Sequence, residues 1–441
     1  MSIRDRIAAA DEAYGALRAL GRDPSALEFG AVSSPTEALL EGRPVTLFGT
    51  NNYLGLTFDP ACLEAAAAGA RGFGAGTTGS RIANGSYAGH GALEREIAAF
   101  YGKAGAIVFS TGYVANLGMI TALAGRGDRI LIDADSHASI YDACRMAEAE
   151  TLRFRHNDPA NLARRLERLR ETPGIKLVIV EGLYSMLGDR APLAEFADVV
   201  REAGEDVHLM VDEAHSLGVL GETGRGLAEE AGVEADVDFV VGTFSKSVGT
   251  VGGFCVSDIE GFDRLRLLSR PYMFTASMTP GAVESARAAF AAMQARPELR
   301  ARLWRNATRL HGGVRALGLG TGPEASPVVA VKLPDPETAV RVWNRLIDEG
   351  VYTNIALPPA TPNGLSLLRV SVSAAHEDAQ IDRALDTLAA IGAEFGLVAP
   401  DARPRPRRRA ALRVVIGDRD PSEGATGRRA PPPTGRAAPK G

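Results

Sequence analysis

The sequence predicts an α/β protein with a large, mostly parallel sheet domain followed by a smaller α+β domain. Between about residues 46 and 285, short β-rich runs alternate with Ala-rich helical stretches, which is typical of a parallel sheet with helices on both faces. From residue 286 to 397 the pattern changes to a long helix, then strands and shorter helices. At 441 residues the chain also exceeds the size at which one core usually stops growing.

The individual elements follow from local patterns. Residues 4–20 are rich in Ala, Leu and Arg with helical spacing, so residues 1–45 are expected to form a helical arm that leads into an extended segment near 33–35. In the small domain a long helix runs through 283–293. The strands of both domains are expected at 106–109, 129–133, 177–181, 208–212, 237–241, 327–333 and 367–372.

The last segment, 398–441, is expected to be a disordered basic tail rich in Pro and Arg. Residues 401–441 hold ten Arg and one Lys against three Asp and one Glu, a net charge of +7. Because the whole chain carries −5, the first 400 residues carry −12. Two interpretations of the tail stand: a tether to anionic lipid or nucleic acid, or a solvated extension without a partner.

Composition excludes several classes of protein. Three cysteines are too few and too scattered for a disulfide framework or a zinc site, so a reducing compartment is expected. The N-terminus carries charges early and lacks the apolar stretch of a signal peptide. No uncharged apolar run reaches the ~18 residues of a membrane-spanning helix. We therefore expect a cytoplasmic protein, peripheral at the inner face of the membrane at most, with no nucleic-acid partner.

The most informative residue is Lys246, which follows the strand-like run 237–241 in a turn lined with hydroxyl groups. A second strand-like run leads into Asp212 and His215, so both clusters can lie at one edge of the sheet, where ligands of open α/β sheets bind. An amine, a carboxylate and hydroxyls in this arrangement suit pyridoxal 5′-phosphate (PLP). Lys246 would form the Schiff base, Asp212 would keep the pyridine nitrogen protonated, and His215 could reach the ring hydroxyl. Taken alone, Lys246 would be interpreted as an ordinary surface lysine and Asp212 as an ordinary acid at the end of a strand. Only their combination favours a cofactor site.

Three other patterns in the sequence do not predict a function. Gly74–Gly79 matches a dinucleotide-binding fingerprint but follows a helix-like stretch instead of a strand. Met210–His215 resembles the acidic strand end of helicase-type NTPases, yet no phosphate-binding loop with its lysine precedes it. The seven histidines are dispersed, which argues against a metal site. His137 is different, because it follows a strand in a polar loop where its ring could stack on a flat cofactor, although such a histidine alone is more often a capping or packing residue.

Several stretches in one order resemble the α-oxoamine synthases, a family of fold-type I PLP enzymes, over roughly residues 30–395. The stretches that carry the resemblance are 109–116, 135–141, 181–189, 212–218 and 242–249. Four others, 34–37, 57–60, 249–254 and 270–277, are most similar to the bacterial members that act on L-serine and palmitoyl-CoA. The resemblance implies a homodimer with shared active sites and a decarboxylating condensation of L-serine with a long-chain acyl-CoA. The products would be 3-oxosphinganine, CoA and CO2.

The resemblance also assigns roles residue by residue. It matches Lys246 to the Schiff-base lysine, Asp212 and His215 to the partners of the pyridine nitrogen and ring oxygen, and His137 to the stacked imidazole. Positions around the cofactor and its phosphate are matched by Gly112, Tyr113, Ser185, Thr243 and Ser245. Thr275 matches a residue that crosses from the other subunit. Asn52 and Arg369 match positions near the carboxylate of the amino acid.

Two positions depart from the family pattern. Related bacterial enzymes usually carry Arg before the Pro-Pro of the small-domain loop, whereas this chain has Leu357, so a cation that can help bind the substrate carboxylate is missing. Either Arg369 and Asn52 suffice, or the preferred amino acid is not serine. Thr78 stands where close relatives tend to have Asn. The alternatives are another α-oxoamine synthase that uses alanine or glycine, such as an 8-amino-7-oxononanoate synthase or glycine C-acetyltransferase, a PLP lyase or aminotransferase, or a binding protein without activity.

Overall fold

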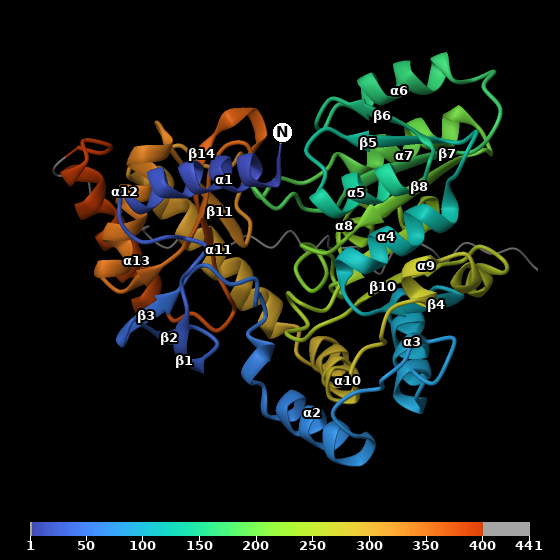
Figure 1. Ribbon diagram of the computed structural model, residues 1–441, viewed down its shortest axis with the longest axis horizontal. Coiled ribbons are helices and arrows are strands. Elements are labelled where there is room, and N and C mark those ends of the chain that lie inside the picture. Colours follow the sequence, from blue (N-terminus) through green and yellow to red (C-terminus); the bar gives the residue numbers. More distant parts are fainter. Residues whose placement is uncertain (1, 400–441) are drawn as a thin grey trace, which may run out of the picture. The chain divides into compact units, whose positions relative to one another are not determined.

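The computed structural model describes residues 2–399, and its main feature is a seven-stranded sheet in the order β4-β10-β9-β8-β7-β5-β6 (Figure 1). Strand β10 pairs antiparallel with both β4 and β9, whereas the other pairings are parallel. The strands are β4 (Gly105–Phe109), β5 (Arg129–Asp133), β6 (Glu150–Phe154), β7 (Lys176–Glu181), β8 (Val207–Asp212), β9 (Phe239–Thr243) and β10 (Gly253–Ser257). The predicted α/β class with a mostly parallel sheet is confirmed.

Helices cover both faces of this sheet because its strands are apolar on both sides. On β7, Leu177 and Ile179 pack in the cluster that includes α4 and α5, while Val178 and Val180 pack in the cluster that includes α3, α6 and α7. All four side chains are fully buried, and burying each contributes about 1.5–3 kcal/mol. These helices are α3 (Ala88–Tyr101), α4 (Gly112–Leu123), α5 (Ala138–Met146), α6 (Pro159–Arg168) and α7 (Leu193–Ala203).

The described residues also form two smaller sheets. The three-stranded sheet β11-β14-β13 is antiparallel, and the four-stranded sheet β1-β2-β3-β12 pairs N-terminal strands with one from the C-terminal part of the chain. Their strands are β1 (Phe29–Ser34), β2 (Glu37–Leu40), β3 (Arg43–Leu47), β11 (Val328–Leu333), β12 (Val351–Tyr352), β13 (Asn354–Ala356) and β14 (Ser366–Ser371). The strands expected at 327–333 and 367–372 are therefore present as β11 and β14.

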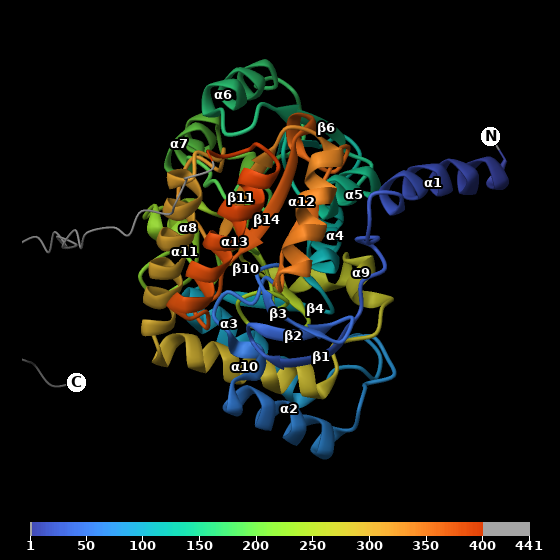
Figure 2. The same ribbon diagram turned by 90° about the vertical axis from the view of Figure 1, so that its left-hand side faces the viewer.

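The described residues contain further helices. They are α1 (Ile3–Arg18), α2 (Pro60–Phe73), α8 (Leu227–Glu230), α9 (Arg270–Met273), α10 (Pro280–Ala295), α11 (Glu298–Ala316), α12 (Pro336–Asp348) and α13 (Asp378–Glu394). Of these, α9 and α10 also pack against the large sheet, Tyr272 on Phe109 and Phe290 on Phe254. Figure 2 shows α1 extending away from the other elements. No helix within residues 2–399 is long and apolar enough to span a membrane. The predicted domain boundaries at 45, 285 and 397 stay predictions, and the tail beyond 399 lies outside the described residues.

The backbone conformation at Thr78 explains why asparagine would suit this position better than threonine. Thr78 has a φ of 57°, in the left-handed region that β-branched residues rarely occupy. Asparagine tolerates that region several times better, because its short polar side chain can hydrogen-bond locally. Threonine at this position is therefore a local strain that an asparagine would relieve.

Candidate functional site

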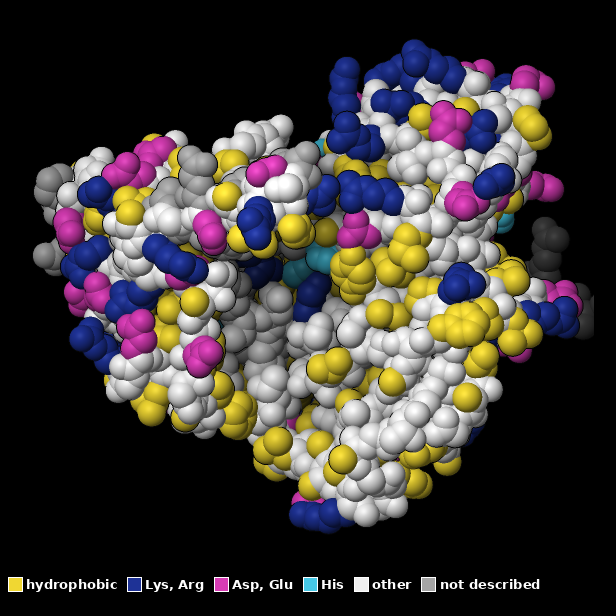
Figure 3. Space-filling model, in the orientation of Figure 1, with side chains coloured by type: hydrophobic (Ala, Val, Ile, Leu, Met, Phe, Trp, Pro, Cys, Tyr) yellow, Lys and Arg dark blue, Asp and Glu magenta, His cyan; other side chains and the backbone are white. Residues whose placement is uncertain are grey.

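A cavity of about 230 Å³ opens at the carboxyl edge of the large sheet. Strand ends β7, β8 and β9 and the amino ends of α4 and α5 surround it, as the rule for open α/β sheets predicts. Figure 3 shows histidine and Lys or Arg side chains in a hollow on this face of the molecule. The residues that line the cavity are Thr111, Gly112, Tyr113, Asn116, His137, Ser139, Glu181, Asp212, Ala214, His215, Val241, Gly242, Thr243, Ser245 and Lys246.

Asp212 ends β8 with both carboxylate oxygens hydrogen-bonded. Its Oδ2 accepts from Asn116 Nδ2 at 2.7 Å, and its Oδ1 accepts from the backbone N–H of Ala214 at 2.9 Å. Only 5% of the residue is exposed. These two donors fix the direction of the carboxylate. Asp212 is thus ready to hold a cationic nitrogen in the cavity.

Lys246 lies in the turn between β9 and β10, close to this carboxylate. Burial lowers the pKa of Lys246 to about 8, although the negative charges of Asp212 and Glu181 oppose the shift. An ordinary lysine has a pKa near 10.4, so this amine loses its proton far more readily. Such an amine can act both as a nucleophile toward a carbonyl carbon and as a base.

His215 is buried beside the cavity and is neutral. Burial lowers its pKa well below the ordinary value, and the charges of Lys246 and Arg369 add to the shift. Its Nδ1 lies 2.7 Å from the hydroxyl of Tyr53, which also accepts a hydrogen bond from Arg369 Nη2 at 3.5 Å. The hydroxyl has one proton and two acceptors within reach, His215 Nδ1 at 2.7 Å and Asn51 Oδ1 at 3.3 Å, and the contact to His215 is the shorter. When the hydroxyl donates to Nδ1, the ring proton of His215 sits on Nε2.

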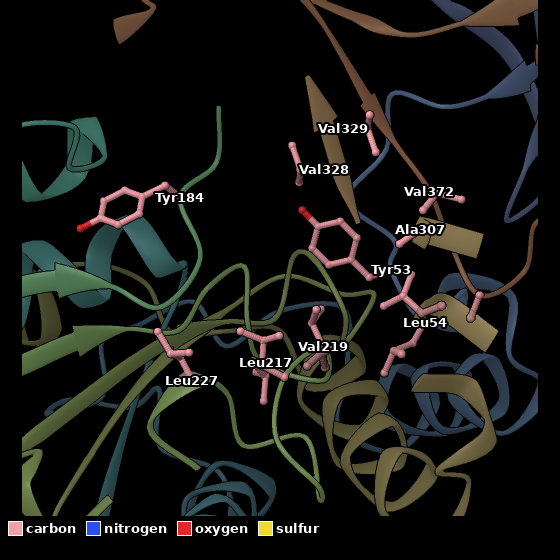
Figure 4. Packing of buried hydrophobic residues seen from close by; sticks show 14 of the residues in the cluster. Tyr53, Leu54, Tyr184, Leu217, Val219, Leu227, Ala307, Val328, Val329 and Val372 are labelled. Atoms are coloured by element: carbon pink, nitrogen blue, oxygen red, sulfur yellow. The ribbon is translucent and has the colours of Figure 1, made fainter. Parts of the chain in front are cut away.

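Tyr53 was missed by the sequence analysis, although it follows Asn52 directly. Its ring is completely buried, and Figure 4 shows it between Leu217 on one side and Val328 on the other. Burial raises the pKa of Tyr53, so its hydroxyl keeps its proton at neutral pH. Tyr53 thus connects the cavity to the small antiparallel sheet, which carries Arg369 on β14.

Glu181 also lines the cavity and was not singled out from the sequence. It ends β7 and pairs in register with Asp212 on β8. The backbone N–H of His137 donates to Glu181 Oε1. Burial and the neighbouring Asp212 raise the pKa of Glu181 well above its ordinary value. Its position after an apolar strand is the same signal that identified Asp212.

His137 lies at the rim of the cavity as the N-cap of α5. Its Nδ1 accepts from the backbone N–H of Ser139 at 3.2 Å and lies 2.8 Å from Ser139 Oγ. The capping role that the sequence analysis considered is therefore present. It also fixes the direction of the ring, which borders the cavity, so capping and a contact with a bound aromatic group are compatible.

The amino end of α4 faces the hydroxyls of Thr243 and Ser245. These two hydroxyl oxygens lie 2.9 Å apart, and a Cβ added at Gly112 would approach Thr243 Cβ to 2.7 Å. Backbone N–H groups in the first turn of a helix lack intrahelical partners and bind phosphate readily. Glycine at 112 lets the chain approach Thr243 closely, and Tyr113 follows it in the same turn. This end of the cavity suits a phosphate group.

The other predicted residues lie outside this cavity. Ser185 accepts a hydrogen bond through its carbonyl from Arg369 Nε at 2.6 Å. Asn52 donates from Nδ2 to Thr57 Oγ1 at 2.7 Å, and its buried Oδ1 has no hydrogen-bond partner within residues 2–399. Thr275 lines a separate cavity beside the segment after α9. Most of the cofactor candidates therefore line one cavity. Asn52 and Arg369 do not line it, and Thr275 lines a different cavity.

Comparison with known proteins agrees with this geometry. The family model for aminotransferase class I and II matches residues 43–388. The chain belongs to the aminotransferase class I and II family. It is 57% identical to the serine palmitoyltransferase of Caulobacter vibrioides over 405 residues, which cover 92% of this chain and 100% of that protein. The resemblance to the α-oxoamine synthases and the fold-type I architecture are thereby confirmed.

Solved structures of this family show the same fold. The chain superposes on a Sphingomonas wittichii serine palmitoyltransferase with a TM-score of 0.87 at 50% identity, covering 90% of this chain and 100% of that one. It also matches a serine palmitoyltransferase solved with its PLP internal aldimine, with a TM-score of 0.88, 48% identity and the same coverage.

Proposed function

We propose that this protein is a serine palmitoyltransferase, a PLP-dependent acyltransferase that condenses L-serine with palmitoyl-CoA. The product is 3-oxosphinganine, with CoA and CO2 released, which is the first step of sphingolipid synthesis. One observation carries the proposal: the amine of Lys246, the carboxylate of Asp212 and the imidazoles of His137 and His215 border one cavity at the sheet edge. The full-length similarity to the Caulobacter enzyme supports the choice of substrates.

The residues around the cavity fit PLP. Its phosphate would bind at the amino end of α4, with Gly112 and Tyr113 N–H groups and the hydroxyls of Thr243 and Ser245. The remaining groups suit an aromatic ring with a cationic nitrogen and a ring oxygen. Asp212 would hold the ring nitrogen, His215 the ring oxygen, His137 the ring face and Lys246 the aldehyde carbon. Ser185 does not line the cavity, and we include it among the cofactor-binding residues because of the family resemblance alone.

Bound PLP supplies an electron sink that stabilises a carbanion at the Cα atom of an amino acid. The chain's own residues set the proton positions around it. Asp212, fixed by Asn116 and Ala214, keeps a positive charge next to its carboxylate. Lys246 Nζ, with a pKa of about 8, can take a proton from Cα and return it near neutral pH. With the Tyr53 hydroxyl donating to Nδ1, His215 carries its proton on Nε2, from which it can donate to an oxygen in the cavity.

The amino-acid carboxylate would bind near Arg369 and Asn52. Arg369 is buried and held by Ser185 O, Ser371 Oγ at 3.1 Å and the Tyr53 hydroxyl. Asn52 Oδ1 is a buried acceptor without a partner among residues 2–399, which suits a ligand that donates a hydrogen bond, such as the hydroxyl of serine.

A second candidate function follows from Leu357, which stands where related enzymes carry Arg. Without that cation, selectivity for serine rests on Arg369 and Asn52. The rival is another α-oxoamine synthase, of the 8-amino-7-oxononanoate synthase or glycine C-acetyltransferase type, that uses alanine or glycine. The rival differs in the amino acid that supports release of CoA.

We further propose that the active form is a homodimer in which Thr275 completes the partner's site. Two features support this. Thr275 is away from the cavity of its own chain, and its neighbour Phe274 is 69% exposed. Leu267 and Leu268 nearby are also exposed. A group of exposed apolar side chains in one segment is typical of an interaction surface.

The location in the cell is a proposal as well: the cytoplasm, with peripheral contact to the inner face of the membrane. The acyl-CoA substrate and the product both carry a long acyl chain, which favours a site of action near lipid. The basic segment beyond residue 399 is a candidate for contact with anionic lipid. Removing that segment and measuring sedimentation with anionic liposomes tests the contact, and unchanged sedimentation would exclude it.

The proposed function is tested by CoA release from purified protein with palmitoyl-CoA and, in turn, serine, alanine or glycine. The visible PLP spectrum is recorded in the same samples. Release with serine is the expected result. Release with alanine or glycine alone would favour the rival synthase. A PLP spectrum without release in any sample would exclude palmitoyl-CoA as the acyl donor and point to another acyl donor or another reaction.

A further inference from the structure

His156 lies outside the cavity but contacts two loops that support it. Its Nδ1 lies 2.8 Å from Asp133 Oδ1, and its Nε2 lies 2.7 Å from Asp189 Oδ2. Asp135 adds a third carboxylate, 3.8 Å from Nδ1. The ring of Tyr184 meets the imidazole edge-on, with ring centroids 4.6 Å apart. One imidazole is therefore surrounded by carboxylates from two loops.

This geometry requires an imidazolium. A neutral imidazole has a single N–H, whereas both ring nitrogens of His156 face carboxylate oxygens at hydrogen-bonding distance. Burial lowers the pKa of His156, but hydrogen bonds and charge from Asp133 and Asp189 outweigh it and raise the pKa to about 10. His156 therefore carries a positive charge throughout the neutral range.

Asp133 connects His156 to the turn that presents His137. It is the last residue of β5 and is fully buried. Its Oδ1 also accepts from the backbone N–H of Asp135 at 2.8 Å, and its Oδ2 accepts from that of Asn157 at 2.9 Å. The turn from Asp133 leads directly to His137 at the start of α5. The position of the backbone that carries the His137 ring thus depends on how Asp133 is held.

Asp189 connects His156 to the loop that holds Arg369. The backbone N–H of Tyr184 donates to the Asp189 carbonyl at 2.9 Å, which closes the loop between them. Within this loop, the Ser185 carbonyl accepts from Arg369 Nε at 2.6 Å. A displacement of Asp189 would therefore reach Arg369 through a short chain of direct contacts.

We propose that His156 is a positioning residue that holds His137 through Asp133 and Arg369 through Asp189. The proposal rests on the proposed function, because it assigns His137 and Arg369 to the cofactor and the amino acid. His156 itself contacts neither. It joins two loops that follow different strands, β5 and β7, and so sets the distance between the two ends of the site.

The first variant is His156→Gln, which removes the positive charge and leaves Asp133 and Asp189 facing each other with one amide between them. A small misplacement of reacting groups can cost about 100-fold in rate. We expect the serine concentration at half-maximal change of the visible PLP spectrum to rise about tenfold or more. The KM for palmitoyl-CoA should stay within about twofold, since a separate substrate is involved.

Two further variants separate positioning from loss of folding. His208→Gln is the matched control, because His208 pairs with Asp238 at 3.4 Å near the opposite edge of the sheet and should leave serine binding unchanged. The double variant His156→Gln/Asp189→Asn removes one of the two uncompensated carboxylates and should recover part of the serine response. Thermal denaturation checks that every variant is folded.

The outcomes are distinct. A folded His156→Gln protein with unchanged serine response would overturn the proposal, as would an equal loss in the His208 control. If wild-type protein binds PLP but does not respond to serine, the proposed function fails instead. In that case the rate of PLP loss after dilution still tests His156, because His137 borders the cofactor cavity: faster loss in His156→Gln supports positioning, and an unchanged rate overturns it.

Discussion

Replacing Tyr53 by Phe removes one oxygen atom from a buried network and leaves the packing of the ring in place. The lost oxygen lies 2.7 Å from His215 Nδ1 and 3.3 Å from Asn51 Oδ1, and it accepts from Arg369 Nη2 at 3.5 Å. The short hydrogen bond sets the tautomer of His215, whereas the longer contact is at the limit of a hydrogen bond. The variant therefore tests whether the tautomer of His215 matters for the reaction.

The expected magnitude follows from the burial of His215. An unsatisfied buried polar group costs about 1–3 kcal/mol, and the long contact to Arg369 contributes little. Since about 1.4 kcal/mol corresponds to tenfold, kcat/KM for serine should fall about 5- to 150-fold. In the variant the proton of His215 no longer has a fixed position, so the visible PLP spectrum should shift as well.

The assay is CoA release at varied serine with saturating palmitoyl-CoA. Tyr352→Phe is the matched control, because its hydroxyl also makes a hydrogen bond, to Asn354 Oδ1 at 3.3 Å, but away from the cavity. Thermal denaturation of both variants separates a loss of stability from a loss of activity. A Tyr53→Phe protein with kcat/KM within about twofold of wild type and an unshifted spectrum would refute the reasoning.

Four shorter predictions follow. Lys246→Ala should abolish both the visible absorbance of covalently attached PLP and CoA release; a variant that keeps the absorbance would exclude the assignment. Thr78→Asn should raise the free energy of unfolding by about 1 kcal/mol, measured by denaturant titration, because asparagine tolerates a φ of 57°. Leu357→Arg should lower the KM for serine about tenfold if a cation there reaches the carboxylate, and an unchanged KM would show that Arg369 suffices. The stability that His156 contributes should be fully present below its ordinary pKa near 6.5 and be lost as the pH rises through about 10. Melting temperatures of wild type and His156→Gln should therefore converge at high pH, and a constant difference would contradict this.

The fold class could be predicted because buried parallel strands leave continuous apolar runs in the sequence. Strands β5, β7 and β8 were located within one residue, and β9 begins two residues later than expected. Strand β6 was missed because it lies at the sheet edge, where its side chains are mostly exposed and no apolar run forms. The pairing of β3 with β12 joins segments about 300 residues apart, and a local pattern carries no signal for it.

The candidate site was predictable where chemistry follows a strand directly. Lys246, Asp212, His215 and His137 were singled out in this way, and the structure brings them around one cavity, while their roles stay predictions. Tyr53 was not found, because its hydroxyl reaches the site through packing between two sheets and not through a motif.

The candidate site draws on two separate sheets, and this division has a consequence for engineering and for evolution. The groups suited to PLP belong to the seven-stranded sheet, whereas Arg369 belongs to β14 of the three-stranded sheet. If Arg369 binds the amino acid as proposed, substitutions in the small sheet should change which amino acid is accepted while cofactor retention stays intact. The proposed division would let one PLP-binding sheet be kept while changes in a second sheet alter the amino acid that the protein accepts.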